Sequence, residues 1–300
     1  MIPMDNVVAL QHNDQTCRLA PGCGGSLLSW SRIGAQGPVD LLRPADPTRA
    51  VSPTDCGCFP LVPFSNRIAA GRFTFQGRAV TLPHDPGFLH AIHGHGWTRG
   101  WTVEDRSTRA LRLALHHSAD AWPWRYSAHQ TIALEDDGLS IRLELLNESD
   151  ETMPAGFGLH PYFPKPPGTR ITMRVGGVWD NDSAMLPHAH HPLPPSLSFP
   201  DGLILEDSVV LDHGFTGWDG HAAIQWTSGP TAGTTVTLLA DGPFGHVIVY
   251  APAGENYLCL EPVSHMTNAL NRPDVDDAGV IALAPGERVS GTLRFRLSSF

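Results

Sequence analysis

The sequence YSAHQTIALEDDGLSIRLEL, residues 126–145, decides the fold class. Two segments in which apolar and polar residues alternate, 126–134 and 139–145, flank the linking sequence EDDG. A period of two places successive side chains on opposite faces of a strand, and a short glycine-containing link between two such segments is typical of a hairpin. The stretch therefore predicts two antiparallel strands joined by a turn at Glu135–Gly138.

Similar short segments recur on both sides of this hairpin, whereas hardly any window carries an apolar stripe at helical spacing over three turns. The 30 Gly and 27 Pro are spread along the chain, as many short strands joined by turns require. We therefore expect an all-β protein, a large antiparallel β-sandwich, formed by residues 1–300 as a single domain. The stretch Asp182–Pro200, rich in Pro and His and without a period, is expected to be a long surface loop. The other expected strands are Leu111–Leu115, Arg170–Val175, Thr234–Leu239, His246–Tyr250, Tyr257–Leu260 and Gly291–Leu297.

Charge and composition exclude several classes of partner. The formal net charge is −10, Lys165 is the only lysine, and no stretch forms the basic surface that nucleic acid or an anionic membrane requires. The N-terminal residues show no secretory signal, and no apolar run approaches the roughly 20 residues of a membrane-spanning helix. The five cysteines form an odd set without a metal-type repeat, which is typical of reduced thiols. We therefore expect a cytoplasmic protein that binds neither nucleic acid nor membrane.

Sixteen histidines raise the possibility of a metal site. His93-Gly94-His95 has the spacing of a cupin-type metal site, in which alternate strand residues face one ion, and a carboxylate follows at Glu104. The bulky residues between them, Trp97 and Trp101 among others, fit that motif poorly. We therefore expect no metal.

His160 stands out because of its neighbours in the segment Gly156–Phe163. Proline at position 161 restricts His160 to extended backbone geometry, which fixes the direction in which its side chain leaves the chain. The aromatic residues around it offer an apolar wall of the kind on which sugar rings stack. The alternative is a hydrogen-bonded core histidine.

Glu261 lies in the expected strand that begins at Tyr257. Alternation places Leu258 and Leu260 on one face, and Tyr257, Cys259 and Glu261 on the other. We expect Glu261 to end the strand, because the proline that follows it cannot donate to a ladder. Its carboxylate then faces either solvent or a cleft at the end of the sandwich.

Arg67 follows the strongly apolar run Phe59–Phe64. A buried arginine is costly unless it is paired or directed at a ligand. Arg67 is therefore either part of a structural ion pair, with Asp55 as the candidate partner, or a ligand-binding residue.

Taken together, these segments resemble the aldose 1-epimerase (galactose mutarotase) family through most of the chain. The residues that carry the resemblance are Asn66–Phe73, Ile92-His93-Gly94 with Trp101-Thr102-Val103, Gly158–Phe163, Leu211–Phe215, Leu258–Pro262 with Asn271-Arg272-Pro273, and Leu283–Glu287.

The resemblance implies a galactose mutarotase-like supersandwich and an isomerase that exchanges the α and β anomers of a free aldose. It also implies that Glu261 is the catalytic base and His160 the catalytic acid. Arg67, His93 and Asp212 would bind the sugar hydroxyls or ring oxygen, with no cofactor. The expected partner is a monosaccharide, and the expected assembly is a monomer or a homodimer. Candidates for sugar stacking are Trp97, Phe215 and Trp218.

The chain departs from the family pattern after His93-Gly94, where His95 stands in place of a frequent second glycine, and after Glu261, where Val263-Ser264-His265 follows. The preferred sugar therefore stays open. One alternative is a hexose-6-phosphate 1-epimerase, whose phosphate pocket would draw on Arg67, Arg72 and Arg99. Others are a non-catalytic carbohydrate-binding protein and a cupin-like metalloenzyme.

Overall fold

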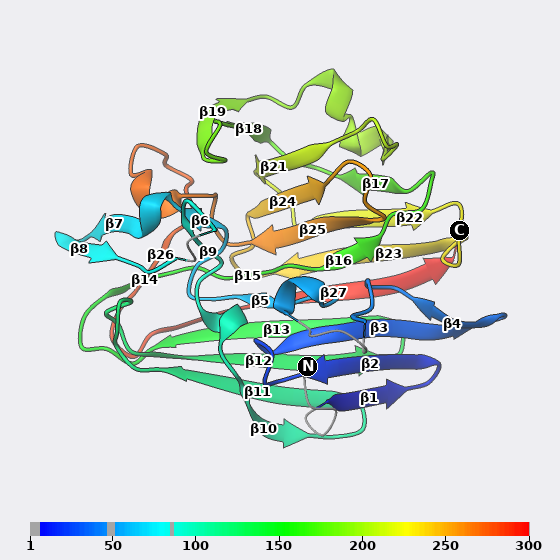
Figure 1. Ribbon diagram of the computed structural model, residues 1–300, viewed down its shortest axis with the longest axis horizontal. Coiled ribbons are helices and arrows are strands. Elements are labelled where there is room, and N and C mark those ends of the chain that lie inside the picture. Colours follow the sequence, from blue (N-terminus) through cyan, green and yellow to red (C-terminus); the bar gives the residue numbers. More distant parts are fainter. Residues whose placement is uncertain (1–6, 47–51, 85–86, 300) are drawn as a thin grey trace.

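A computed structural model describes residues 7–46, 52–84 and 87–299, which form an almost entirely antiparallel β structure (Figure 1). The helical segments in these ranges are short 3-10 turns. No helix in the described ranges is long and apolar enough to cross a membrane. The turns are η2 (Pro53–Asp55), η3 (Ala69–Gly71), η4 (Gly96–Thr98), η5 (Pro195–Leu197), η6 (Phe199–Asp201) and η7 (Ala269–Asn271).

The larger sheet has nine strands and includes the hairpin predicted at residues 126–145. Leu134 pairs with Leu139 and Glu135 with Gly138, so the predicted turn is confirmed. The last strand, β27, pairs with β13 on one side and β23 on the other, and so joins the middle of the chain to its C-terminal part. In spatial order the strands are β10 (Thr102–Arg106), β11 (Ala110–His117), β12 (Tyr126–Glu135), β13 (Gly138–Asn147), β27 (Arg288–Ser299), β23 (Thr234–Asp241), β22 (His221–Trp226), β17 (Arg170–Met173) and β20 (Leu203–Ile204).

The second sheet carries the strand predicted to hold Glu261. That strand, β25, lies near the middle of the sheet between β24 on one side and the two short strands β15 and β16 on the other. In spatial order the strands are β19 (Pro187–His191), β18 (Gly177–Asn181), β21 (Leu211–Thr216), β24 (His246–Ala251), β25 (Tyr257–Val263), β15 (Gly158–Leu159) and β5 (Pro60–Leu61), with β16 (Tyr162–Pro164) also paired to β25.

Smaller sheets complete the structure. An N-terminal four-stranded sheet lies against β12 of the larger sheet (Figure 1). Its strands are β1 (Val8–His12), β2 (Gln15–Ala20), β3 (Ser26–Gly34) and β4 (Gly37–Asp40), and the remaining pairs are β6 (Arg67–Ile68) with β9 (Ala91–Ile92), β7 (Arg72–Phe75) with β8 (Arg78–Thr81), and β14 (Met153–Ala155) with β26 (Ile281–Leu283).

The two large sheets pack through their apolar faces, as the alternation predicted. Phe163 of the second sheet and Phe295 of the larger sheet are in ring contact, with centroids 6.1 Å apart. Leu258 and Leu260 belong to the same core cluster, whereas Cys259 belongs to a separate cluster on the other face of β25. The face of the second sheet that points away from the main core is therefore free to build a site.

Two predictions about individual segments are wrong. Asp182–Pro200 is not a plain loop, because it contains β19 and the 3-10 turn η5, and a second turn, η6, begins at its end. β19 is a mostly exposed edge strand that begins with a proline, so it carries no alternating pattern from which it could be recognised. Strand β25 does not end at Glu261 but continues to Val263. On the side of β25 opposite β24, the neighbouring strand is interrupted at this point, between β15 and β16.

A pair of phenylalanine variants tests the position of the core. Phe295 is fully buried against Trp30 and Phe163, whereas Phe88 is 51% exposed. Phe295→Ala is expected to lower the free energy of unfolding by about 3–5 kcal/mol, and Phe88→Ala by only about 0.5 kcal/mol. Urea denaturation of the two variants and the unchanged protein measures both values, and equal losses would contradict this packing.

Candidate active site

The strand register places His160 opposite Glu261. Gly158 pairs with Val263 and Tyr162 pairs with Cys259, and continuing this antiparallel register brings His160 and Glu261 to facing positions. His160 Nε2 lies 3.4 Å from Glu261 Oε1, and both side chains are buried. The two predicted catalytic residues therefore form a direct contact.

Two aromatic rings fix the plane of the His160 imidazole. Phe59 stacks on the imidazole with centroids 4.6 Å apart and an interplanar angle of 27°. Tyr162 stacks with centroids 4.7 Å apart at an angle of 17°. The backbone N–H of His160 also donates to the carbonyl of Phe59 at 3.0 Å. The extended geometry expected before Pro161 thus leads into a rigid stack, and the ring can present Nε2 in only a narrow range of directions.

Burial shifts both groups of this pair toward their uncharged forms. Burial raises the pKa of Glu261 well above its ordinary value, and the carboxylate of Asp212 adds to this while Arg67 opposes it. Burial also lowers the pKa of His160 from 6.5 to about 3, with a further contribution from the charge of Arg43. Burial therefore shifts the pair toward a neutral imidazole beside a protonated carboxyl group.

The pair has unused hydrogen-bonding capacity. His160 Nδ1 and Glu261 Oε2 are buried and have no hydrogen-bond partner among the residues that the structure describes. Such atoms are costly to leave unsatisfied and are expected to be explained by a ligand or by function.

All five residues of the predicted site line one pocket of about 150 Å³. They come from separate parts of the chain, so only the fold brings them together. The lining residues are Asn66, Arg67, Ile92, His93, His160, Asp212, Ile248, Tyr250 and Glu261.

Arg67 lies in β6 at the edge of this pocket. Its Nη1 donates to Asn66 Oδ1 at 3.2 Å. The suggested partner, Asp55, instead accepts the backbone N–H of Ser52 at 2.9 Å. The ion-pair alternative with Asp55 is therefore not realised, and the guanidinium of Arg67 faces the pocket.

The backbone at His93-Gly94 is shaped by close packing. Gly94 has a φ of 69°, and a Cβ at this position would lie 2.0 Å from the carbonyl oxygen of Val62, so a side chain has no room. His93 Nδ1 accepts the backbone N–H of Asn66 at 3.2 Å, and burial lowers the pKa of His93 well below its ordinary value. A neutral imidazole that accepts at Nδ1 carries its proton on Nε2. Nε2 of His93 is therefore the nitrogen able to donate.

Asp212 stands on β21 across from Tyr250 of β24. Burial raises the pKa of its carboxyl group, while Arg67 and His213 act in the opposite direction. Tyr250 and Asn66 were not predicted as site residues. Tyr250 could have been suggested by strand alternation with Ile248, and Asn66 by its position directly before Arg67.

The predicted stacking residues do not line this pocket. Phe215 and Trp218 are part of the main core. Trp97 is half-buried, stacks on Phe59 with centroids 5.6 Å apart, and donates its Nε1 proton to the carbonyls of Gly94 and Ile92, at 3.1 and 3.3 Å. Trp97 therefore supports the stack behind His160 from a neighbouring hollow.

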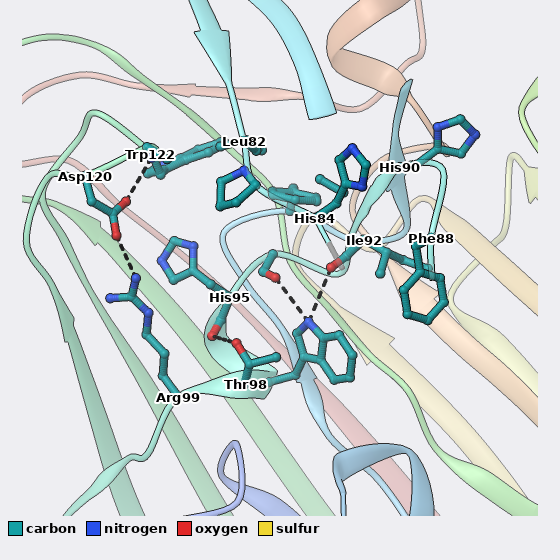
Figure 2. A pocket seen from close by; sticks show the side chains of 16 residues that line it. Leu82, His84, Phe88, His90, Ile92, His95, Thr98, Arg99, Asp120 and Trp122 are labelled. Atoms are coloured by element: carbon teal, nitrogen blue, oxygen red, sulfur yellow. Dashed lines mark hydrogen bonds and ion pairs between the residues drawn. The ribbon is translucent and has the colours of Figure 1, made fainter. Parts of the chain in front are cut away.

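That neighbouring hollow, which we call the outer hollow, has a volume of about 370 Å³ and shares Ile92 with the pocket (Figure 2). His95 lines it and is hydrogen-bonded to Tyr126 at 2.6 Å, whereas His93 lines the pocket. The two histidines do not face one point, so the arrangement of a cupin-type site is absent. Arg99 also lines the outer hollow, and its charge is paired with Asp120 at 2.7 Å.

Within the described part of the chain, one set of side chains could hold a metal ion. His160, Cys259 and Glu261 each offer one ligand atom, and these atoms lie within 4.8 Å of one another. Cys259 is a free thiol, and it is fully buried on the same face of β25 as Glu261.

Comparison with known proteins shows similarity over nearly the whole chain. The family model described as aldose 1-epimerase matches residues 6–296. YphB of Escherichia coli K12, an uncharacterised protein, is 35% identical over 266 residues, which cover 86% of this chain and 88% of YphB. A crystal structure of a candidate aldose 1-epimerase from E. coli K12 superposes with a TM-score of 0.87 at 30% identity, covering 98% of this chain and 99% of that one. A galactose mutarotase-like protein from Clostridium acetobutylicum, at 19% identity, shares the fold with a TM-score of 0.85 and coverages of 98% and 95%. The chain belongs to the aldose 1-epimerase family.

Proposed function

We propose that the protein is an aldose 1-epimerase that exchanges the α and β anomers of a free aldose such as glucose or galactose. The observation that carries this proposal is the buried contact between His160 and Glu261 inside a pocket lined by hydrogen-bonding groups. An acid and a base in contact are what opening and closing a sugar ring require.

In the proposed reaction, Glu261 removes the proton of the C1 hydroxyl while His160 donates a proton to the ring oxygen O5. The C1–O5 bond breaks, and the sugar becomes an open-chain aldehyde. Rotation about the C1–C2 bond presents the other face of the carbonyl group. His160 then takes back the proton from the O5 hydroxyl, Glu261 returns its proton to O1, and the opposite anomer closes.

The two catalytic groups together hold the same number of protons throughout. Ring opening begins with a carboxylate and an imidazolium, and it ends with a carboxyl group and a neutral imidazole. The second arrangement is the one that burial favours in the unliganded protein. Burial therefore favours the carboxyl group with a neutral imidazole, which is the proton distribution that accompanies the open-chain sugar. Sugar hydroxyls that hydrogen-bond to the pair favour the carboxylate with an imidazolium.

The other predicted residues supply groups that can hold sugar hydroxyls. Arg67 and the Nε2–H of His93 can donate, and the carboxyl group of Asp212 can accept. Proton transfer of this kind needs neither a redox cofactor nor a metal ion.

We propose the cytoplasm as the location of the protein and a monomer or homodimer as its assembly.

The first test replaces the two catalytic groups one at a time. His160→Asn and Glu261→Gln keep the shapes of the side chains but remove proton transfer, so kcat/KM for anomer exchange should fall by about 10²–10⁴-fold. Polarimetry on freshly dissolved α-glucose and α-galactose measures the rate above the spontaneous reaction. The exposed residues His116 and Glu206 provide matched controls as His116→Asn and Glu206→Gln. Near-normal rates in either site variant would contradict the assignment.

The second test is the pH dependence of kcat/KM. The proposed reaction uses one proton that His160 and Glu261 share. Because the pKa of His160 is lowered to about 3, the pair takes up a second proton only at strongly acidic pH, and no group is then left to act as the base. The rate should therefore stay level through pH 6.5, where an ordinary histidine titrates, and fall only far below it. An acid limb with its midpoint near 6.5 would show that burial does not control the protonation of His160.

The third test concerns a phosphate on the sugar. The pocket contains one arginine, Arg67, beside the carboxyl groups of Asp212 and Glu261, while Arg99 is paired with Asp120 in the outer hollow. A desolvated charge without a partner costs more than about 1–3 kcal/mol, so free glucose should have a kcat/KM at least roughly tenfold above that of its 6-phosphate. NMR exchange spectroscopy of both sugars measures this ratio. A preference for the phosphate would favour the hexose-6-phosphate alternative.

A further inference from the structure

We propose that His160, Cys259 and Glu261 form a binding site for a thiophilic divalent cation such as Zn²⁺, and that this cation inhibits the enzyme. An imidazole nitrogen, a thiol sulfur and a carboxylate oxygen lie within 4.8 Å of one another, and all three side chains are buried. Cys259 has no part in the proposed exchange of anomers. Its position two residues before Glu261, on the same face of β25, adds a third ligand to the catalytic pair.

The geometry of the three groups is close to what zinc requires. Bonds from zinc to nitrogen, oxygen and sulfur of about 2.0–2.3 Å place tetrahedral ligand atoms roughly 3.5 Å apart. His160 Nε2 and Glu261 Oε1 are already 3.4 Å apart, and the stacked rings of Phe59 and Tyr162 hold the imidazole in place. All three ligand atoms lie within 4.8 Å of one another, so closing the set by roughly 1 Å at most would place them at three corners of a tetrahedron.

The charges of the complex cancel. Binding releases one proton from Cys259 Sγ and one from the Glu261 carboxyl group, which leaves a thiolate and a carboxylate. With a neutral His160 imidazole, the two negative charges balance the two positive charges of the cation. A neutral complex avoids the large cost of burying net charge. The sulfur ligand favours zinc over magnesium, because magnesium prefers oxygen ligands.

The fourth ligand position can open into the pocket, because His160 and Glu261 both line it. Water or a sugar hydroxyl could occupy that position. A cation held by His160 and Glu261 uses the electron pairs that must accept and return protons, so it blocks anomer exchange and competes with the sugar. This part of the inference rests on the proposed function, whereas cation binding itself does not.

The experiment compares the unchanged protein with Cys259→Ala. Cys17→Ala is the matched control, since Cys17 is also fully buried but lies on β2 in the main core. Isothermal titration with Zn²⁺, and separately with Mg²⁺, measures affinity without using activity. Co²⁺ serves as a spectroscopic probe, because a cobalt–thiolate bond gives a charge-transfer band.

We expect the unchanged protein and Cys17→Ala to bind one Zn²⁺ ion with equal affinity, and not to bind Mg²⁺. Cys259→Ala should bind Zn²⁺ more than roughly tenfold more weakly and lose the cobalt–thiolate band. Equal affinity in Cys259→Ala would overturn the site and would point to surface histidines such as His188, His190 and His191.

The activity measurement separates the two claims. Zn²⁺ should inhibit anomer exchange in the unchanged protein, with an apparent inhibition constant that rises with sugar concentration. Cys259→Ala should keep its activity and resist inhibition by more than roughly tenfold. Binding through Cys259 without inhibition would overturn the proposed blocking of the catalytic pair. If the protein binds Zn²⁺ through Cys259 but shows no anomer exchange even before zinc is added, the cation site is supported and the proposed function is overturned.

Discussion

The contact between His160 and Glu261 depends on the register of two antiparallel strand segments. Because side chains alternate along a strand, a shift of one residue would place His160 opposite Leu260 or Pro262 instead of Glu261. The register is fixed from the other face of the sheet, where Leu258 and Leu260 pack into the main core. The core thus determines where the two proposed catalytic groups meet.

Burial gives this contact its chemical character. In water, a histidine and a glutamate would form an ion pair near neutral pH, but burial shifts the pKa of His160 down and that of Glu261 up. Burial therefore moves the balance away from the ion pair and toward the neutral pair, which is the proton distribution that accompanies the open-chain sugar in the proposed reaction. The same neutral imidazole and nearby carboxyl group, with Cys259 beside them, also suit a soft cation. If the site exchanges protons as proposed, the same groups also open it to inhibition by such a cation.

Much of the fold could be predicted from local sequence, because alternation is a local property. The hairpin at Glu135–Gly138 and the two faces of β25 followed from it. The exposed strand β19 and the continuation of β25 through Pro262 could not be predicted, because both depend on neighbouring strands. The site residues came from family resemblance, and the sequence alone did not indicate that they meet. The ring stack of Phe59 and Tyr162 on His160 also depends on contacts between distant segments.

The central claim is that His160 and Glu261 act as one catalytic unit. A double-mutant cycle tests it most directly, with kcat/KM for anomer exchange measured in His160→Asn, Glu261→Gln and the variant that carries both changes. If each group needs the other, the double variant should lose little more activity than either single variant. Losses that multiply, so that the double variant falls by the product of the two single effects, would show that the two groups act independently and would contradict the account.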